Sequence, residues 1–149
     1  MTRTRRRRVL PADPAAVWAV VGDPYALRRW WPRVERVEQV AAGEFTEVLR
    51  SERGRTVRAD YRLTTLEEPT EIAWEQMIEN TPFERVMAYS STTIRLTPEG
   101  DGTRIEIERG QQMRGMSRLG GFMIRRATGR VLDEAFDALA GELAAPPAG

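Results

Sequence analysis

Residues 9–38 have the sequence VLPADPAAVWAVVGDPYALRRWWPRVERVE, in which prolines and a glycine bound two short helices. Asp13 is a suitable N-cap, and Pro14 fits the first helical position because its missing N–H has no helical partner there. Four apolar residues with helical spacing follow: Val17, Trp18, Val20 and Val21. Gly22 ends this helix, and a second helix over residues 25–31 stops before the next proline. We therefore predict two short helices here rather than a β-hairpin.

Residues 3–10 precede these helices and predict a first strand with a solvated, arginine-rich outer face. An alternative is a flexible arm that contacts nucleic acid or an acidic partner, because closely spaced arginines can bind several phosphates. No second basic stripe or exposed aromatic platform supports that alternative. Charged side chains also prevent edge-to-edge pairing of strands, so we favour a solvated edge strand.

After Pro32 the apolar residues alternate, as in half-buried strands. The clearest case is residues 55–66, where Val57 and Tyr61 share one face and Arg58 and Asp60 share the other. Further strands are predicted over residues 34–40, 45–51, 72–78 and in a hairpin over 92–108. In this hairpin, the inward residues of the two arms oppose one another: Ile94 and Leu96 with Ile105 and Ile107.

From Ser117 the apolar period becomes that of a helix, which we expect to run to about Ala144. One face carries an apolar stripe: Val131, Leu132, Ala135, Phe136, Leu139 and Leu143. Glycines at 120, 121 and 129 weaken its first half. Residues 1–3 and 145–149 are expected to be frayed ends of a single domain that spans residues 1–149.

Composition excludes several kinds of chemistry. The 149 residues include no cysteine and no histidine, which excludes disulfides, zinc sites built on those residues and triads with an imidazole base. We expect no metal and no cofactor. No apolar run approaches the roughly 20 residues that span a bilayer, and the N-terminus lacks a secretory signal, so we expect a cytoplasmic protein without membrane insertion. The net charge of +1 makes nucleic-acid binding an unfavoured alternative, and the absence of lysine indicates a GC-rich bacterial genome.

The opening segment resembles the START-like, or SRPBCC, superfamily and in particular its polyketide cyclase/dehydrase-like branch. The residues that carry the resemblance are Val17, Trp18, Asp23, Trp30 and Pro32, and the hairpin LTPEGDGTRIEIE is similar to the penultimate turn of that family. The resemblance implies an α+β helix-grip fold. In this fold a curved antiparallel sheet has six to seven strands, two short helices follow the first strand, and one long C-terminal helix crosses the concave face.

The inward positions of the predicted strands define a candidate ligand-binding face opposite the long helix. These positions are Val57, Tyr61, Trp74, Gln76, Ala88, Ser90, Thr92, Ile107, Arg109, Gln111 and Met113. The small residues on the strand of Ala88 leave room where a filled core would have large side chains, which predicts a cavity. Alternatively, Trp74 or Phe122 fills that space. Leu119, Phe122, Met123 and Arg126 of the last helix form either a movable wall of the cavity or ordinary packing.

Arg109 is the most informative single residue, because it is in phase with inward-facing neighbours and a buried guanidinium needs a partner. Two structural explanations compete with ligand binding: a bulge at Gly110 that frees Arg109 to solvent, or an ion pair with Glu47. Of the adjacent Trp30 and Trp31, only one can face inward as core, and the other either lies at the pocket rim or is structural as well.

Three functions remain open. The first is a binding or carrier protein for a small hydrophobic or amphipathic ligand, which includes lipid binding. The second is an aromatase/cyclase-type enzyme without metal, whose proton carriers would be Tyr61, Glu47 or, less favoured, Asp60, with Arg109 stabilising an oxyanion. The third is an interaction module for a protein or RNA partner. The ligand and the oligomeric state are not specified by the sequence.

Overall fold

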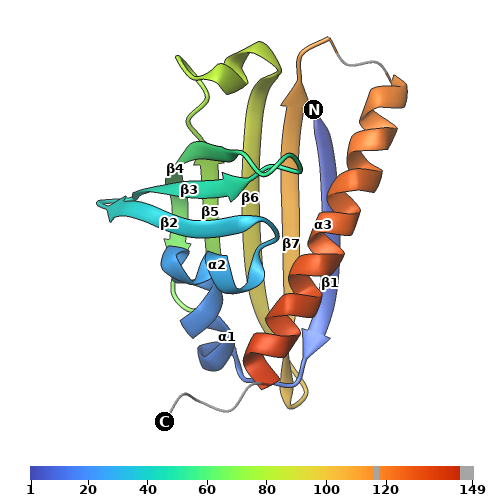
Figure 1. The fold of residues 1–149 in the computed structure, drawn as a ribbon. Helices are drawn as coiled ribbons and strands as arrows, with labels where there is room; N and C mark the ends of the chain where they lie inside the picture. The colour runs from blue at the N-terminus through green and yellow to red at the C-terminus, as the bar shows by residue number, and fades with distance from the viewer. Residues whose placement is uncertain (116–117, 145–149) are drawn as a thin grey trace.

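Seven antiparallel strands form one curved sheet in the computed structural model, which describes residues 1–115 and 118–144 (Figure 1). The strands are β1 (Thr2–Leu10), β2 (Val34–Ala41), β3 (Glu44–Arg50), β4 (Thr56–Glu67), β5 (Glu71–Gln76), β6 (Met87–Glu99) and β7 (Gly102–Met113). Their order across the sheet is β1-β7-β6-β5-β4-β3-β2, so β1 and β2 form its edges. The long helix α3 (Arg118–Ala144) completes the α+β helix-grip fold, which confirms the predicted fold class.

The segment between β1 and β2 is helical, as its prolines and glycine predicted. Helix α1 (Pro14–Val21) begins after Asp13, whose Oδ1 accepts a hydrogen bond of 2.8 Å from the backbone N of Ala16. A short 3-10 turn, η1 (Pro24–Ala26), and helix α2 (Leu27–Trp30) follow. A second 3-10 turn, η2 (Pro82–Arg85), lies between β5 and β6.

β1 is an edge strand whose arginines are held by carboxylates on both sides. On the outer face of the sheet, Arg5 Nη2 donates to Glu108 of β7 at 2.7 Å. On the helix side, Arg8 Nη1 donates to Asp137 of α3 at 2.8 Å. Exposed pairs of this kind each contribute little to stability. They confirm the interpretation of β1 as a charged, solvated edge.

The expectation that residues 1–3 are frayed was wrong for Thr2 and Arg3. Thr2 begins β1, pairs with Gln111 of β7 and is only 4% exposed. Its side chain lies against Gly121 of α3, and this contact accounts for the order of the strand end. The predicted start of the last helix at Ser117 and the predicted tail at 145–149 lie outside the described residues.

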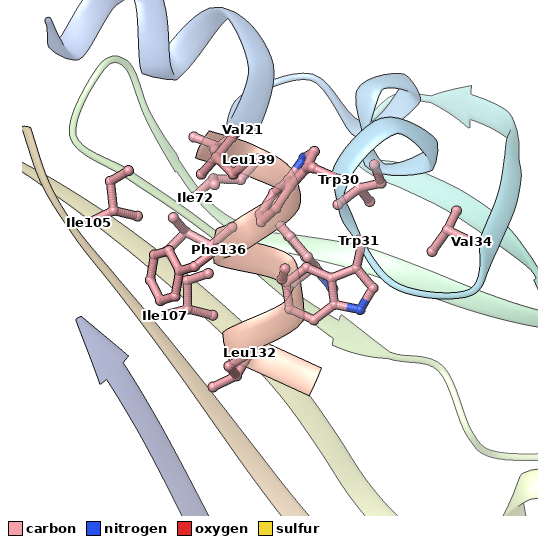
Figure 2. Packing of buried hydrophobic residues seen from close by; sticks show 14 of the residues in the cluster. Val21, Trp30, Trp31, Val34, Ile72, Ile105, Ile107, Leu132, Phe136 and Leu139 are labelled. Atoms are coloured by element: carbon pink, nitrogen blue, oxygen red, sulfur yellow. The ribbon is translucent and has the colours of Figure 1, made fainter. Parts of the chain in front are cut away.

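The core is formed by the second half of α3 on the sheet. Leu132, Phe136 and Leu139 are fully buried, and Figure 2 shows Phe136 beside Ile105 and Ile107 of β7. The two arms of the β6–β7 hairpin pair as predicted, with Ile107 opposite Ile94. Burying side chains of this size stabilises the fold by about 1.5–3 kcal/mol each. No helix in the described part of the chain is long and apolar enough to cross a membrane.

Replacement of Gly102 by alanine is expected to destabilise the fold. A Cβ at this position would collide with the backbone carbonyl oxygen of Leu10, which cannot move without disturbing the β1–β7 pairing. Overpacking of this kind costs roughly 1–3 kcal/mol. Gly141→Ala is the matched control, because nothing lies within 4 Å of a Cβ at that helical position. That control is expected to gain up to about 1 kcal/mol in the free energy of unfolding, measured by urea denaturation. Equal stability of the two variants would contradict this interpretation.

Candidate functional site

A hollow remains between the sheet and α3, beside the core. It has a volume of about 320 Å³, at the lower end of the range of about 300–1,000 Å³ that is typical of ligand sites. Val131 lines it from α3, and most of its wall comes from the sheet. Gly121, Thr128 and Gly129 precede Val131 on the buried face of α3 and lie against β1 and β7 instead. Gly121 lies beside Thr2, Gly129 lies beside Arg6, and Thr128 Oγ1 donates to Gln111 at 2.8 Å.

The structure brings most of the predicted site residues together around this cavity. The predicted positions that line it are Val57, Tyr61, Trp74, Gln76, Ser90, Thr92, Arg109 and Gln111. Glu47, a candidate proton carrier, lines it as well. Further lining residues include Trp31, Arg33, Leu49, Arg50, Phe83, Met87 and Val131. The cavity is therefore mainly apolar, with polar side chains that come from several strands, among them Glu47 of β3, Gln76 of β5 and Arg109 of β7.

Ala88 does not lie on the cavity, and its assignment to the inner face is corrected. The register of β6 on β7 shifts between Met87 and Tyr89, so a bulge places one extra residue at Ala88. Because side chains alternate along a strand, one extra residue reverses the faces beyond it. Met87 therefore lines the cavity in place of Ala88, which is exposed. Nothing in the local sequence marks this bulge.

Ile107 and Met113 are also removed from the site. Ile107 points inward as predicted, but α3 covers it and it is part of the core. Met113 pairs with Met87 at the end of β7, beyond Gln111, where the cavity stops. Strand alternation predicted the face of both residues correctly. It could not predict how far α3 covers that face.

The prediction that Phe122 and Met123 form a wall of the cavity was wrong. Their side chains are 55% and 61% exposed, because the buried face of α3 contains Gly121 and Thr128 instead. Arg126 is exposed on the same side. Leu119 lies in α3, but its side chain is outside what the structure describes.

Arg109 reaches into the cavity from β7. The strand continues without a register shift through Gly110, so the predicted alternative of a bulge that frees Arg109 does not hold. Its Nη2 donates to Ser90 Oγ at 3.2 Å, and its guanidinium lies 5.8 Å from the ring centroid of Trp31. Its Nε is buried and has no hydrogen-bond partner among the described residues. The guanidinium thus retains an unused donor.

Glu47 lies close enough to Arg109 for the positive charge to affect its pKa. Within the described residues the two side chains form no ion pair. The carboxyl is 4% exposed, and burial raises its pKa to about 7. Interaction with the Tyr61 hydroxyl and the positive charge of Arg109 both lower the pKa, but less than burial raises it. Burial also raises the pKa of Tyr61 well above its ordinary value, and the negative charge of Glu47 adds to this effect. Glu47 can therefore exchange a proton near neutral pH, whereas Tyr61 stays protonated.

Aromatic rings form the floor of the cavity. Trp74 lies edge-on to Trp31, with centroids 6.4 Å apart, and to Phe45, at 5.8 Å. Phe45 stacks on Tyr61 at 5.4 Å. Trp30 and Trp31 are both buried and both belong to the core, so the expectation that only one of them could face inward was wrong. Trp31 has left the helical conformation, which allows both rings to face inward, and it also lines the cavity. Trp31, Tyr61 and Trp74 thus present aromatic surface to the cavity, which suits a ring or a short apolar chain.

Gln76 adds a second unused donor where the sheet opens. The pairing of β5 with β6 ends at Glu75 and Ser91, so the two strands separate at the next residue. Gln76 is 7% exposed and its Nε2 has no hydrogen-bond partner among the described residues. It also borders a polar groove on the other side of the sheet, formed with Arg62 and Glu75.

Within the described residues, no cluster of three acidic side chains could hold a metal ion.

Comparison with solved structures places this arrangement among known folds. A START superfamily protein from Mycobacterium smegmatis is similar with a TM-score of 0.78, 14% identity, and 96% and 97% coverage of this chain and that one. A conserved protein from Geobacillus kaustophilus has a TM-score of 0.78, 17% identity and 95% coverage of both chains. The di-domain aromatase/cyclase StfQ of the steffimycin biosynthetic pathway has a TM-score of 0.75, 11% identity, and 94% and 50% coverage.

The sequence itself carries a family signature over nearly its whole length. No curated protein matches it at a significant level. The profile of the family described as polyketide cyclase / dehydrase and lipid transport matches residues 1–144. The chain therefore belongs to the polyketide cyclase/dehydrase and lipid transport family.

Proposed function

We propose that this protein binds a small, mainly apolar molecule that carries an oxygen acceptor, such as a carbonyl, carboxylate or phenolic group. The observation that carries the proposal is Arg109, a guanidinium inside an apolar chamber with an unused Nε donor. A buried charge without a full set of partners is costly, and a ligand oxygen would supply the missing acceptor. Gln76 offers a second donor of the same kind.

The size and walls of the cavity support a compact ligand. A volume of about 320 Å³ favours one or two rings or a short acyl chain over a two-chain lipid. The rings of Trp31 and Trp74 would contact the apolar body, while Arg109, whose guanidinium lies over the Trp31 ring, would hold the oxygen beside them. The description of the family, which includes lipid transport, is consistent with a carrier of this kind.

A second candidate is an enzyme of the cyclase type, and the pair of Glu47 and Tyr61 favours it. Glu47 in its charged form would accept a proton from the carbon next to a ligand carbonyl. Arg109 would stabilise the enolate oxygen that results, and the protonated Glu47 would return the proton in a later step. Asp60 takes no part, because it lies on the outer face and accepts a hydrogen bond of 2.6 Å from Thr46.

The Arg109→Met variant is expected to lose affinity for an anionic aromatic probe but not for its neutral analogue. Loss of a charge-assisted hydrogen bond should weaken binding of 2-naphthoate by roughly 10- to 100-fold and leave naphthalene binding unchanged. Fluorescence titration measures both affinities. Arg130→Met, at an exposed position of α3, is the matched control. Unchanged affinity of Arg109→Met for 2-naphthoate would contradict the proposal.

Native mass spectrometry of the protein from its own host would identify the natural ligand.

The catalytic candidate predicts that the protein accelerates exchange of the α-protons of 2-tetralone with D2O, followed by proton NMR. Glu47→Gln should lower the catalysed rate by roughly 100-fold or more, because general-base catalysis typically contributes that much. Glu44→Gln removes a carboxylate from an exposed position of the same strand and should leave the rate unchanged. If Glu47→Gln exchanges as fast as the unmodified protein, Glu47 is not the base.

Burial of Glu47 also predicts how stability depends on pH. Between its ordinary pKa of 4.5 and its folded pKa of about 7, the unfolded chain releases a proton that the folded protein keeps. Stability from this group is therefore full at pH 4.5, falls as the pH rises, and is lost above pH 7. The Glu47→Gln variant does not lose this stability. The free energy of unfolding of the variant minus that of the unmodified protein should therefore increase by about 3 kcal/mol between pH 4.5 and pH 8. Urea denaturation of both proteins at the two pH values measures this, and a constant difference would refute it.

A further inference from the structure

Two large apolar side chains on α3 serve neither the cavity nor the core. Phe122 and Met123 are consecutive and more than half exposed. Both belong to the first half of α3, and Figure 1 shows this half of the helix beside the beginning of β1. Exposed apolar residues are common, so this pair is informative only together with the charges that surround it.

The charges around this pair are positive. Phe122 sits in a shallow groove of about 300 Å³ that is bounded by residues 3–6 of β1 and by Arg125 and Arg126 of α3. We refer to Arg3, Arg5, Arg6, Phe122, Met123, Arg125 and Arg126 together as the basic patch. Within β1, Arg3 and Arg5 both pair with Glu108, and Arg6 pairs with Asp133. Neither Arg125 nor Arg126 has an ion pair with any described residue.

Charge is segregated along the exposed face of α3. Arg125, Arg126 and Arg130 occupy its first half, whereas Asp133 and Asp137 occupy its second half. A negatively charged surface would therefore attract one end of the helix and repel the other. This orients the molecule with the beginning of α3 and of β1 towards such a surface.

We infer that the basic patch docks this protein on the surface of an anionic lipid membrane, with Phe122 and Met123 entering the headgroup layer. Arginines beside exposed apolar side chains are the combination by which proteins lie at such interfaces. Each arginine near an anionic surface raises the partition coefficient by roughly fivefold. Proteins that bind single-stranded nucleic acid stack successive bases on several aromatic side chains, whereas the basic patch contains a single aromatic ring, which favours a lipid surface over RNA.

Co-sedimentation of the protein with lipid vesicles tests this inference. Binding is expected to vesicles of mixed phosphatidylglycerol and phosphatidylcholine, and not to phosphatidylcholine alone, and it should weaken as salt is added. Phe122→Ser/Met123→Ser and Arg125→Glu/Arg126→Glu should each reduce partitioning by roughly tenfold or more. All four positions are exposed, so both variants should keep the circular dichroism spectrum of the parent.

The matched control is Arg53→Glu/Arg55→Glu, which makes the same charge change at two exposed positions of the β3–β4 turn. It should retain most of the binding to anionic vesicles. Failure of the parent protein to bind those vesicles would overturn the inference, and so would an equal loss in the control. Binding to single-stranded RNA with no affinity for vesicles would overturn it as well. The patch lies outside the cavity, so 2-naphthoate affinity should be unchanged in both patch variants.

Discussion

Contact between the second half of α3 and strand β7 holds the interior together and divides it in two. Leu132, Phe136 and Leu139 of α3 lie over Ile105 and Ile107, and these residues form a dry core with no polar group among them. Beyond this core the same strand continues to the hollow. The inward positions of β7 change accordingly, from isoleucine under the helix to Arg109 and Gln111, which line the cavity. One strand thus contributes both to the core and to the hollow.

The hollow contains groups that burial alone would disfavour. Glu47 and Arg109 face one another across a space with low polarity, where a charge is stabilised less than in water. Burial raises the pKa of Glu47 more than the positive charge of Arg109 lowers it, so the Glu47 carboxyl keeps its proton up to near neutral pH. A filled apolar core at these positions would be more stable. Retention of polar groups that lower stability is characteristic of sites that bind or transform a ligand.

Strand alternation and proline placement predicted the fold well, because each is a local effect. The faces of Tyr61, Trp74 and Arg109 followed from alternation within a single strand, and the helices before β2 followed from Asp13 and Pro14. Errors arose where geometry depends on two elements together. The bulge at Ala88 exists only in the pairing of β6 with β7, and the exposure of Phe122 depends on which side of α3 meets β1. Neither the bulge nor the orientation of α3 can be predicted from a short stretch of sequence.

The pairing of β1 with β7 has a consequence for the way the chain is made. Arg3 and Glu108, which meet across these strands, are 105 residues apart. At typical rates of protein synthesis, β1 leaves the ribosome roughly 5–20 seconds before its partner exists. A bare apolar strand would be free to associate with other nascent chains during that interval. Repulsion between the arginines of two β1 strands prevents their association until the glutamates of β7 have been synthesised. The charge of β1 therefore protects the nascent chain from association, as it protects the edge of the folded sheet.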